Sequence, residues 1–140
     1  MIPNFKAHPW HGISAGAEVP NVVNVFVEIV PSDTIKYEID KQSGYLKVDR
    51  PQQFSNIIPA LYGFIPRTYC HDEVLKLAIE SGADDVETGD LDPLDICVLS
   101  SHNIHAGGML MEAIPIGGFK MIDKGEADDK IVAVMKGDHA

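Results

Sequence analysis

The sequence predicts a mainly β protein with a little α structure, folded as a closed or nearly closed antiparallel barrel. Several short apolar runs are separated by clusters of Gly, Asn, His and Asp, a spacing typical of small barrels. One segment alone, 72–82, has the apolar spacing of a helix. At 140 residues, the chain is long enough for one domain with its own core and too short for two ordinary domains.

The first half of the chain is expected to form an arm, a strand and a hairpin. Residues 1–20 are rich in Gly, Pro and His without a sustained period, which is typical of an irregular arm on the surface. The valine-rich run 22–30 predicts a strand. Alternating runs at 35–40 and 45–48 flank a Gly-bearing connection of hairpin length, 41–44.

The second half is expected to supply the helix and the remaining strands. Asp72 can cap the helix and Gly82 suits its C-terminal end, after which 84–95 forms an acidic loop. Further short strands are expected at 96–99, 109–114, 119–122 and 131–135. We expect the glycine pairs 107–108 and 117–118 to form turns and bends of the barrel, because no helix pattern follows them.

The charge balance excludes some classes of partner. The chain has 11 Lys and Arg against 21 Asp and Glu, a net charge of −10, which argues against a general nucleic-acid or anionic-membrane footprint. The longest near-apolar stretch, 57–66, is too short for a membrane span of roughly 20 residues. The two cysteines, Cys70 and Cys97, fit a reducing compartment as buried thiols, with Cys97 in the core. We therefore expect a soluble, cytoplasmic protein.

Three carboxylates lie close together in the segment 89–95, immediately before an apolar strand. Convergent carboxylates usually bind a cation or hold a proton. Because Pro93 fixes its own φ, Asp90 and Asp92 can point to one side while the turn brings Asp95 back toward them. A solvated acidic turn is the alternative. An EF-hand loop starting at Asp90 is excluded, because Asp95 falls where the turn glycine belongs.

Two further charged groups could complete a site. The loop 120–130 carries Asp123 and Asp128; alone it is an ordinary polar loop, but with the first group it supplies carboxylates for more than one hard divalent ion. The early strands carry Glu28, Lys36, Glu38 and Arg50. Such a mixture is expected where phosphate meets metal ions, since Arg50 can bind phosphate bidentately and Lys36 adds a point charge.

Six short stretches occur in one order along the chain: 27–29, 35–40, 48–50, 59–66, 89–95 and 123–130. They contain the motifs K-x-E, Y-G, D-x-D-P-x-D and D-x-x-x-x-D-x-K. Each motif alone is weak, but the combination is highly specific. With it, the chain resembles the family I soluble inorganic pyrophosphatases from about residue 28 to residue 134.

The resemblance implies a five-stranded OB-type barrel with a short helix or helices packed outside. Its mouth would hold several Mg²⁺ ions, with Mn²⁺ as a possible substitute, and pyrophosphate would be hydrolysed there to two phosphates. A homo-oligomer is also implied, a hexamer in bacteria or a dimer in eukaryotes. Family members continue beyond the position of Ala140 with a helix and a Tyr-Lys pair, so we expect this single domain, 1–140, to lack a C-terminal helix.

The resemblance also implies roles for individual residues. The metal ions would be bound by Asp90, Asp95, Asp123 and Asp128, with Glu28 and Glu38 holding metal-bound waters. Phosphate oxygens would be bound by Lys36, Arg50 and Lys130. Asp92 would be the general base, Tyr62 would be hydrogen-bonded at the site, and Asp49 would support it.

Other interpretations give the same residues different roles. The barrel could be a non-catalytic phosphate- or metal-binding module, inactive through loss of the C-terminal part. An OB-type single-strand binder is a weaker alternative, because the chain lacks interleaved basic and aromatic residues. The spacing of Cys97, His102 and His105 fits no common zinc site. Three residues of the arm are expected to pack and cap it: His8, Trp10 and His11.

Overall fold

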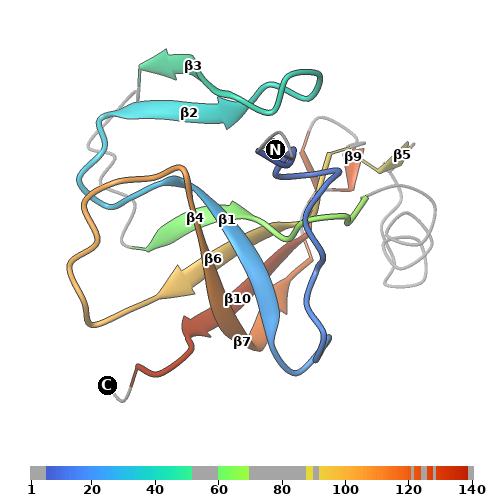
Figure 1. Cartoon of the computed structure of the whole chain (residues 1–140), viewed down its shortest axis with the longest axis vertical. Helices are drawn as coiled ribbons and strands as arrows, with labels where there is room; N and C mark the ends of the chain where they lie inside the picture. The colour runs from blue at the N-terminus through green and yellow to red at the C-terminus, as the bar shows by residue number, and fades with distance from the viewer. Residues whose placement is uncertain are drawn as a thin grey trace, which may run out of the picture.

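The computed structural model describes seven ranges of the chain: 6–51, 60–69, 88–89, 92–120, 122–123, 126–127 and 129–138. The residues in these ranges form ten strands (Figure 1). The helix predicted at 72–82 and Cys70 lie outside the described residues. Within the described ranges, no helix has the length and apolar character needed to cross a membrane.

Five strands close into a barrel in the order β1-β4-β6-β10-β7, which confirms the expected five-stranded barrel. They are β1 (Val23–Ile29), β4 (Leu61–Phe64), β6 (Asp95–Leu99), β7 (Met109–Phe119) and β10 (Lys130–Met135). Four neighbouring pairs are antiparallel, but β6 and β10 run parallel. The prediction of an antiparallel barrel is wrong at this pair. An odd number of strands in a closed ring cannot alternate in direction throughout, and β7 supplies the crossover that a parallel pair needs.

The longest strand, β7, corrects the prediction of two separate strands at 109–114 and 119–122. It continues from Met109 to Phe119, and Ile122 begins a separate short strand. Gly117 and Gly118 therefore lie within β7 instead of forming a turn, next to a bulge where Ile116 of β7 is skipped in the register with β10. A Cβ added at Gly118 would lie 2.9 Å from the carbonyl oxygen of Lys130, so this glycine lets the two backbones approach closely at the bulge.

The predicted hairpin is confirmed as β2 (Ile35–Ile39) paired antiparallel with β3 (Leu46–Pro51). It forms a sheet of its own at the top of Figure 1, next to β1. Its turn is held by Asp40, whose carboxylate accepts a hydrogen bond from the backbone N–H of Ser43 at 3.1 Å. Gly44 completes the turn at a φ of 80°, a conformation that favours glycine.

The inner and outer faces of the barrel wall carry different side chains, because successive residues of a strand face opposite sides. Along β6, Ile96 and Val98 are fully buried, whereas Asp95 and Cys97 occupy the alternate, outward positions and are half-buried. The interior is filled by Val23, Val25, Val27, Val30, Leu61, Ile65, Ile96, Val98, Ala113 and Ala133. A second apolar cluster lies where the arm and the hairpin cover the outside of the wall: Trp10, Phe26, Ile39 and Phe64, with Leu46 packed against them.

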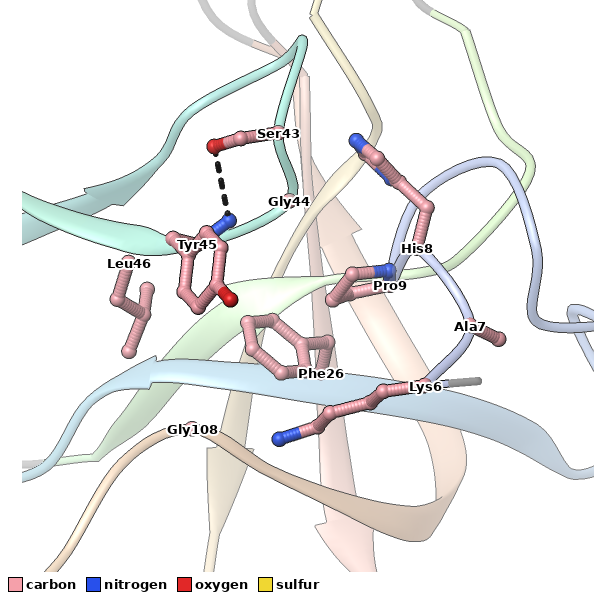
Figure 2. Close-up of a pocket in the computed structure, with 10 residues that line it drawn as sticks. All are labelled: Lys6, Ala7, His8, Pro9, Phe26, Ser43, Gly44, Tyr45, Leu46 and Gly108. Carbon is pink, nitrogen blue, oxygen red and sulfur yellow. Dashed lines mark hydrogen bonds between the residues drawn. The ribbon is translucent and has the colours of Figure 1, made fainter. Parts of the chain in front are cut away.

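The N-terminal arm is anchored at the edge of this second cluster. Trp10 is buried, and its indole Nε1–H donates to the carbonyl of Thr68 at 2.7 Å. His8 Nδ1 accepts hydrogen bonds from the backbone N–H groups of Trp10 and His11, which confirms the predicted packing and capping. Between the arm and the β2–β3 turn lies a cavity of about 410 Å³ with Phe26 in its wall (Figure 2).

Gly63 fixes how closely β4 approaches β1. A Cβ at this position would lie 1.9 Å from the carbonyl oxygen of Phe26, so any side chain would push the two strands apart. Gly63 pairs with Val27, and the register shifts between Val27 and Ile29. The glycine of the Y-G motif therefore belongs to the wall itself and places Tyr62 at the point where β1 bulges.

Candidate active site

Three side chains from three barrel strands meet on the outer face of the wall. Lys130 of β10 lies beside Asp95 of β6 in the parallel ladder, and its Nζ donates to Asp95 Oδ2 at 2.8 Å. Both side chains are less than 20% exposed, at 18% and 19%. The same Nζ lies 5.5 Å from the ring centroid of Tyr62 on β4. The ladder register therefore brings a carboxylate, an ammonium group and a phenol together where they are largely shielded from water.

Burial and charge together set the protonation of this group. Burial alone would lower the pKa of Lys130, but the charge and hydrogen bond of Asp95 outweigh it, so the pKa is raised and the ammonium stays charged. Burial raises the pKa of Tyr62, and Asp95 adds to the effect, so the hydroxyl keeps its proton as a hydrogen-bond donor. Burial also raises the pKa of the Cys97 thiol; Cys97, expected in the core, is half-buried on this face.

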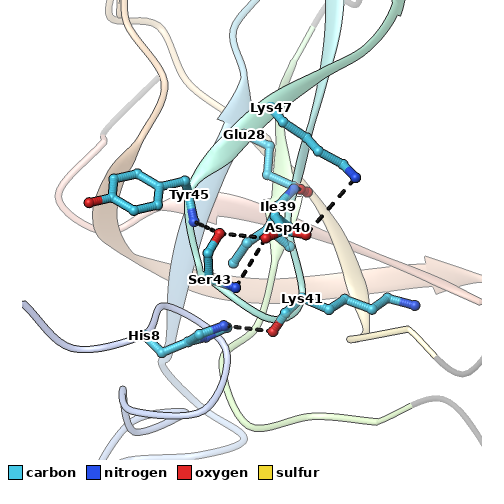
Figure 3. Close-up of polar contacts among 8 residues, drawn as sticks. All are labelled: His8, Glu28, Ile39, Asp40, Lys41, Ser43, Tyr45 and Lys47. Atoms are coloured by element: carbon cyan, nitrogen blue, oxygen red, sulfur yellow. Dashed lines mark hydrogen bonds and ion pairs between the residues drawn. The ribbon is translucent and has the colours of Figure 1, made fainter.

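Glu28 lies next to the group, at the bulge of β1, and is almost completely buried. Its Oε2 accepts a hydrogen bond from the backbone N–H of Ile39 at 2.8 Å, which joins β1 to the hairpin (Figure 3). The pKa of Glu28 is raised to about 8, mainly by burial and also by the nearby charges of Asp95 and Glu38, although the hydrogen bond from Ile39 and the charge of Lys36 act to lower it. Negative charge is therefore crowded here, and a bound cation would relieve the crowding.

The hairpin carries two cationic side chains around one carboxylate. Lys36 Nζ lies 3.4 Å and Arg50 Nε lies 3.9 Å from Asp49 Oδ2. Lys36 and Arg50 are also register partners across β2 and β3. The side chain of Arg50 is 66% exposed, so it can contact a ligand, and Asp49 lies within ion-pair distance of both cations.

Asp92 precedes β6 and forms an ion pair with Lys41 of the β2–β3 turn. The sequence patterns did not single out Lys41, because one lysine in a hairpin connection is ordinary. No sequence pattern marks it, because tertiary packing is what places the turn beside the segment before β6.

Comparison with known proteins identifies the family. The family model described as inorganic pyrophosphatase matches residues 25–140. The chain belongs to the inorganic pyrophosphatase family. It is similar to the inorganic pyrophosphatase of Chlamydia muridarum, with 50% identity over 97% of this chain and 65% of that protein, and to a soluble inorganic pyrophosphatase of Solanum tuberosum, with 42% identity over 96% of this chain and 55% of the other.

A solved structure gives the same family. The crystal structure of inorganic pyrophosphatase from Thermus thermophilus superposes with a TM-score of 0.74 and 30% identity, covering 94% of this chain and 64% of that one. The chain therefore spans somewhat less than two thirds of the length of these pyrophosphatases.

A small sheet brings together the two acidic segments expected to bind metal in a pyrophosphatase. It consists of β5 (Thr88–Gly89), β9 (Glu126–Ala127) and β8 (Ile122–Asp123), in that order. Gly89 and Ala127 are register partners in the parallel pair β5–β9. Each directly precedes a predicted ligand, Asp90 or Asp128, which themselves lie outside the described residues. The backbone thus brings two distant acidic segments side by side.

The described part of the site differs in place from the expected barrel mouth. Tyr62, Asp95 and Lys130 lie on the outside of the wall, and Glu28 lies beneath the hairpin, because the interior is filled with apolar side chains. Among the described residues, which leave out Asp90 and Asp128, no three acidic, His or Cys side chains form a metal-binding group. The backbone of Asp123 lies in β8.

Proposed function

We propose that this chain hydrolyses inorganic pyrophosphate to two phosphates at the outer face of β4, β6 and β10, and that Mg²⁺ is required. The observation that supports this most directly is the Tyr62–Asp95–Lys130 group beside the buried Glu28. It supplies a cation, a hydrogen-bond donor and crowded carboxylates in one place, in a chain of the pyrophosphatase family.

The residues present fit a divalent metal ion. Carboxylate oxygens are the ligands that Mg²⁺ prefers, and Mn²⁺ is the expected substitute. Burial and the neighbouring carboxylates Asp95 and Glu38 raise the pKa of Glu28, and a bound cation would favour its ionised form. We assign metal binding to Asp90, Asp95, Asp123 and Asp128, with Glu28 and Glu38 acting through water. When bound, such ions lower the pKa of water and neutralise phosphate charge.

The protein's own residues then bind the substrate and move a proton. The negative oxygens of pyrophosphate repel a nucleophile, so Lys36, Arg50 and Lys130 bind them and offset their charge. The hydroxyl of Tyr62 donates a hydrogen bond to the same phosphate oxygens. Asp92 accepts a proton from the attacking water; a new P–O bond forms, the bridging P–O bond breaks, and both phosphates leave.

A phosphate-release assay on the purified chain tests the proposal. We expect Mg²⁺-dependent turnover that stops when the metal is chelated. Asp92→Asn should lower kcat by about 100-fold or more, the range of general-base catalysis. Glu112→Gln, an exposed carboxylate on β7 paired with Lys136, is the matched control and should keep full activity. Pyrophosphate binding measured by calorimetry without any turnover would instead indicate a non-catalytic binding module.

Two further properties are proposed from the family resemblance. We propose that the protein is a homo-oligomer, a hexamer if it is bacterial, and that it is cytoplasmic. Sedimentation velocity at several protein concentrations tests the first, and a single species of 15.3 kDa would contradict it.

A further inference from the structure

Two contacts connect the N-terminal arm, the β2–β3 turn and Asp92. His8 Nε2 donates a hydrogen bond to the backbone carbonyl of Lys41 at 2.8 Å (Figure 3). The ammonium of Lys41 forms an ion pair with Asp92 Oδ1. The arm therefore holds the backbone of the residue whose side chain holds the proposed general base.

His8 is fixed in the orientation that this contact needs. Its Nδ1 accepts from the backbone N–H groups of Trp10 and His11, at 3.1 and 3.2 Å. A neutral imidazole that accepts at Nδ1 carries its proton on Nε2, which is the atom that faces the Lys41 carbonyl. The tautomer is thus set by the arm's own backbone.

The turn that carries Lys41 is closed by its own hydrogen bonds and packs against the arm. Asp40 accepts from the N–H of Ser43, and the Gly44 N–H donates to the Asp40 carbonyl at 2.8 Å. A Cβ added at Gly44 would lie 3.0 Å from His8 Cδ2 and from Pro9 Cδ. The arm and the turn meet at this close contact (Figure 2), so the backbone of Lys41 has a defined position.

The chain beyond Asp92 is also held by the arm, through Thr68. The N–H of Leu94 donates to Thr68 Oγ1 at 2.8 Å, and the Thr68 carbonyl accepts from the indole of Trp10. The N–H of Ile65 also donates to the Leu94 carbonyl at 3.0 Å. The backbone after Asp92 is therefore held through Thr68, and the side chain of Asp92 is held through Lys41.

We infer that Lys41 is a positioning residue for the general base, and that His8 holds Lys41 in place. This inference rests on the function proposed above. An ion pair at Oδ1 fixes the plane of the Asp92 carboxylate and therefore the direction in which Oδ2 faces. The side chains of Lys41 and Asp92 are 50% and 33% exposed, so the pair contributes little to stability and a Lys41 variant is expected to fold.

Steady-state kinetics with pyrophosphate and Mg²⁺ separate positioning from substrate binding. We expect Lys41→Ala to lower kcat about tenfold with KM within about twofold, and Lys41→Arg to restore most of kcat. His8→Ala should have the same signature with a smaller effect. Lys47→Ala is the matched control, because Lys47 lies on the same hairpin and pairs with Asp40 at 4.0 Å; its kcat should be unchanged. A raised KM with normal kcat would overturn the inference, as would full activity of Lys41→Ala.

A second measurement does not depend on turnover. The ¹³C resonance of the Asp92 carboxyl group, measured by NMR in the full chain, should shift in Lys41→Ala and less in His8→Ala, and should stay in place in Lys47→Ala. If the parent chain shows no hydrolysis, the proposed function fails while these shifts still support the positioning contact. If the Asp92 resonance is the same in the parent and in Lys41→Ala, the positioning contact is wrong whatever the activity.

Discussion

The two faces of the barrel wall are built from the same strands, but the inner face carries apolar side chains and the outer face carries charged ones. The inner face of β6 presents Ile96 and Val98, both fully buried, and the outer face of the same strand presents Asp95 half-buried beside Lys130. One face removes apolar area from water, and the other keeps charges in a partly dry place. Side chains that stabilise the fold and side chains of the candidate site are therefore one residue apart along a strand, so each kind can be changed without the other.

A substitution at Gly63 should have the largest effect on stability, because it changes the wall itself and therefore both of its faces. In Gly63→Ala the new Cβ would meet the Phe26 carbonyl, 1.9 Å away, so β1 and β4 must move apart. We expect a loss of more than about 4 kcal/mol in the free energy of unfolding, measured by urea denaturation. Gly137→Ala is the control for inserting a methyl group: a Cβ there meets nothing within 4 Å, although its φ of 86° adds some strain. Comparable losses in both variants would contradict the clash.

Because of Glu28, the free energy of unfolding should fall as the pH rises. The folded protein keeps the Glu28 proton up to a pKa of about 8, while the unfolded chain releases it near the ordinary value of 4.5. Between these values the folded state binds more protons, so without divalent ions stability falls by at most about 1.4 kcal/mol per pH unit.

The measurement is urea denaturation from pH 5 to pH 8 in chelator. The total change should be up to about 4 kcal/mol, and Glu28→Gln should flatten this dependence while Glu112→Gln leaves it in place. Equal slopes in the parent and in Glu28→Gln would show that Glu28 titrates normally.

The inner face should respond to loss of volume. Ile96→Ala leaves a cavity in the barrel interior, and we expect it to lower the free energy of unfolding by about 3 kcal/mol. Leu99→Ala on the same strand removes an outward side chain that is 43% exposed and should cost under about 1 kcal/mol. Thermal unfolding of both variants checks the difference, and a reversed order would mean that the two faces are assigned wrongly.

The smallest effect is expected from weakening the phosphate contact that we propose for Arg50 on the hairpin. Arg50→Lys keeps the charge but loses the bidentate fork, so kcat/KM for pyrophosphate should fall about tenfold, or about 1.4 kcal/mol. Stability should stay within about 0.5 kcal/mol, since the side chain is 66% exposed. Lys47→Arg on the same strand is the control. Unchanged kinetics in Arg50→Lys would remove Arg50 from the substrate site.

Much of the fold could be predicted because period-two alternation identifies a strand without knowledge of its neighbours. The hairpin follows from the alternating runs at 35–40 and 45–48, and the strands β1, β6 and β10 follow from the apolar runs at 22–30, 96–99 and 131–135. The parallel pair β6–β10 could not, because side-chain alternation carries no information about strand direction. Nor could the continuity of β7, since Gly117 and Gly118 are interpreted as a turn unless their pairing with β10 beside the bulge of β7 is known.

The candidate site was predictable in its residue types and less so in its geometry. Asp95, Tyr62 and Lys130 were expected together, and they meet through ladder register. The depth of Glu28 was not predictable, because it depends on the hairpin folding back over β1. Lys41 was missed for the same reason: its importance comes from where the turn lies, and a turn's place is set by tertiary packing.

The parallel ladder between β6 and β10 has a consequence for how the protein folds. Lys130 and Asp95 are separated by 35 residues, and their pairing must wait until the chain between them, including β7, has crossed the barrel. Pairing of β6 with β10 therefore closes one edge of the ring and brings the two charged side chains together. During refolding, the proposed turnover should return with ring closure and lag behind the local β2–β3 hairpin, so its return would indicate that the ring is complete.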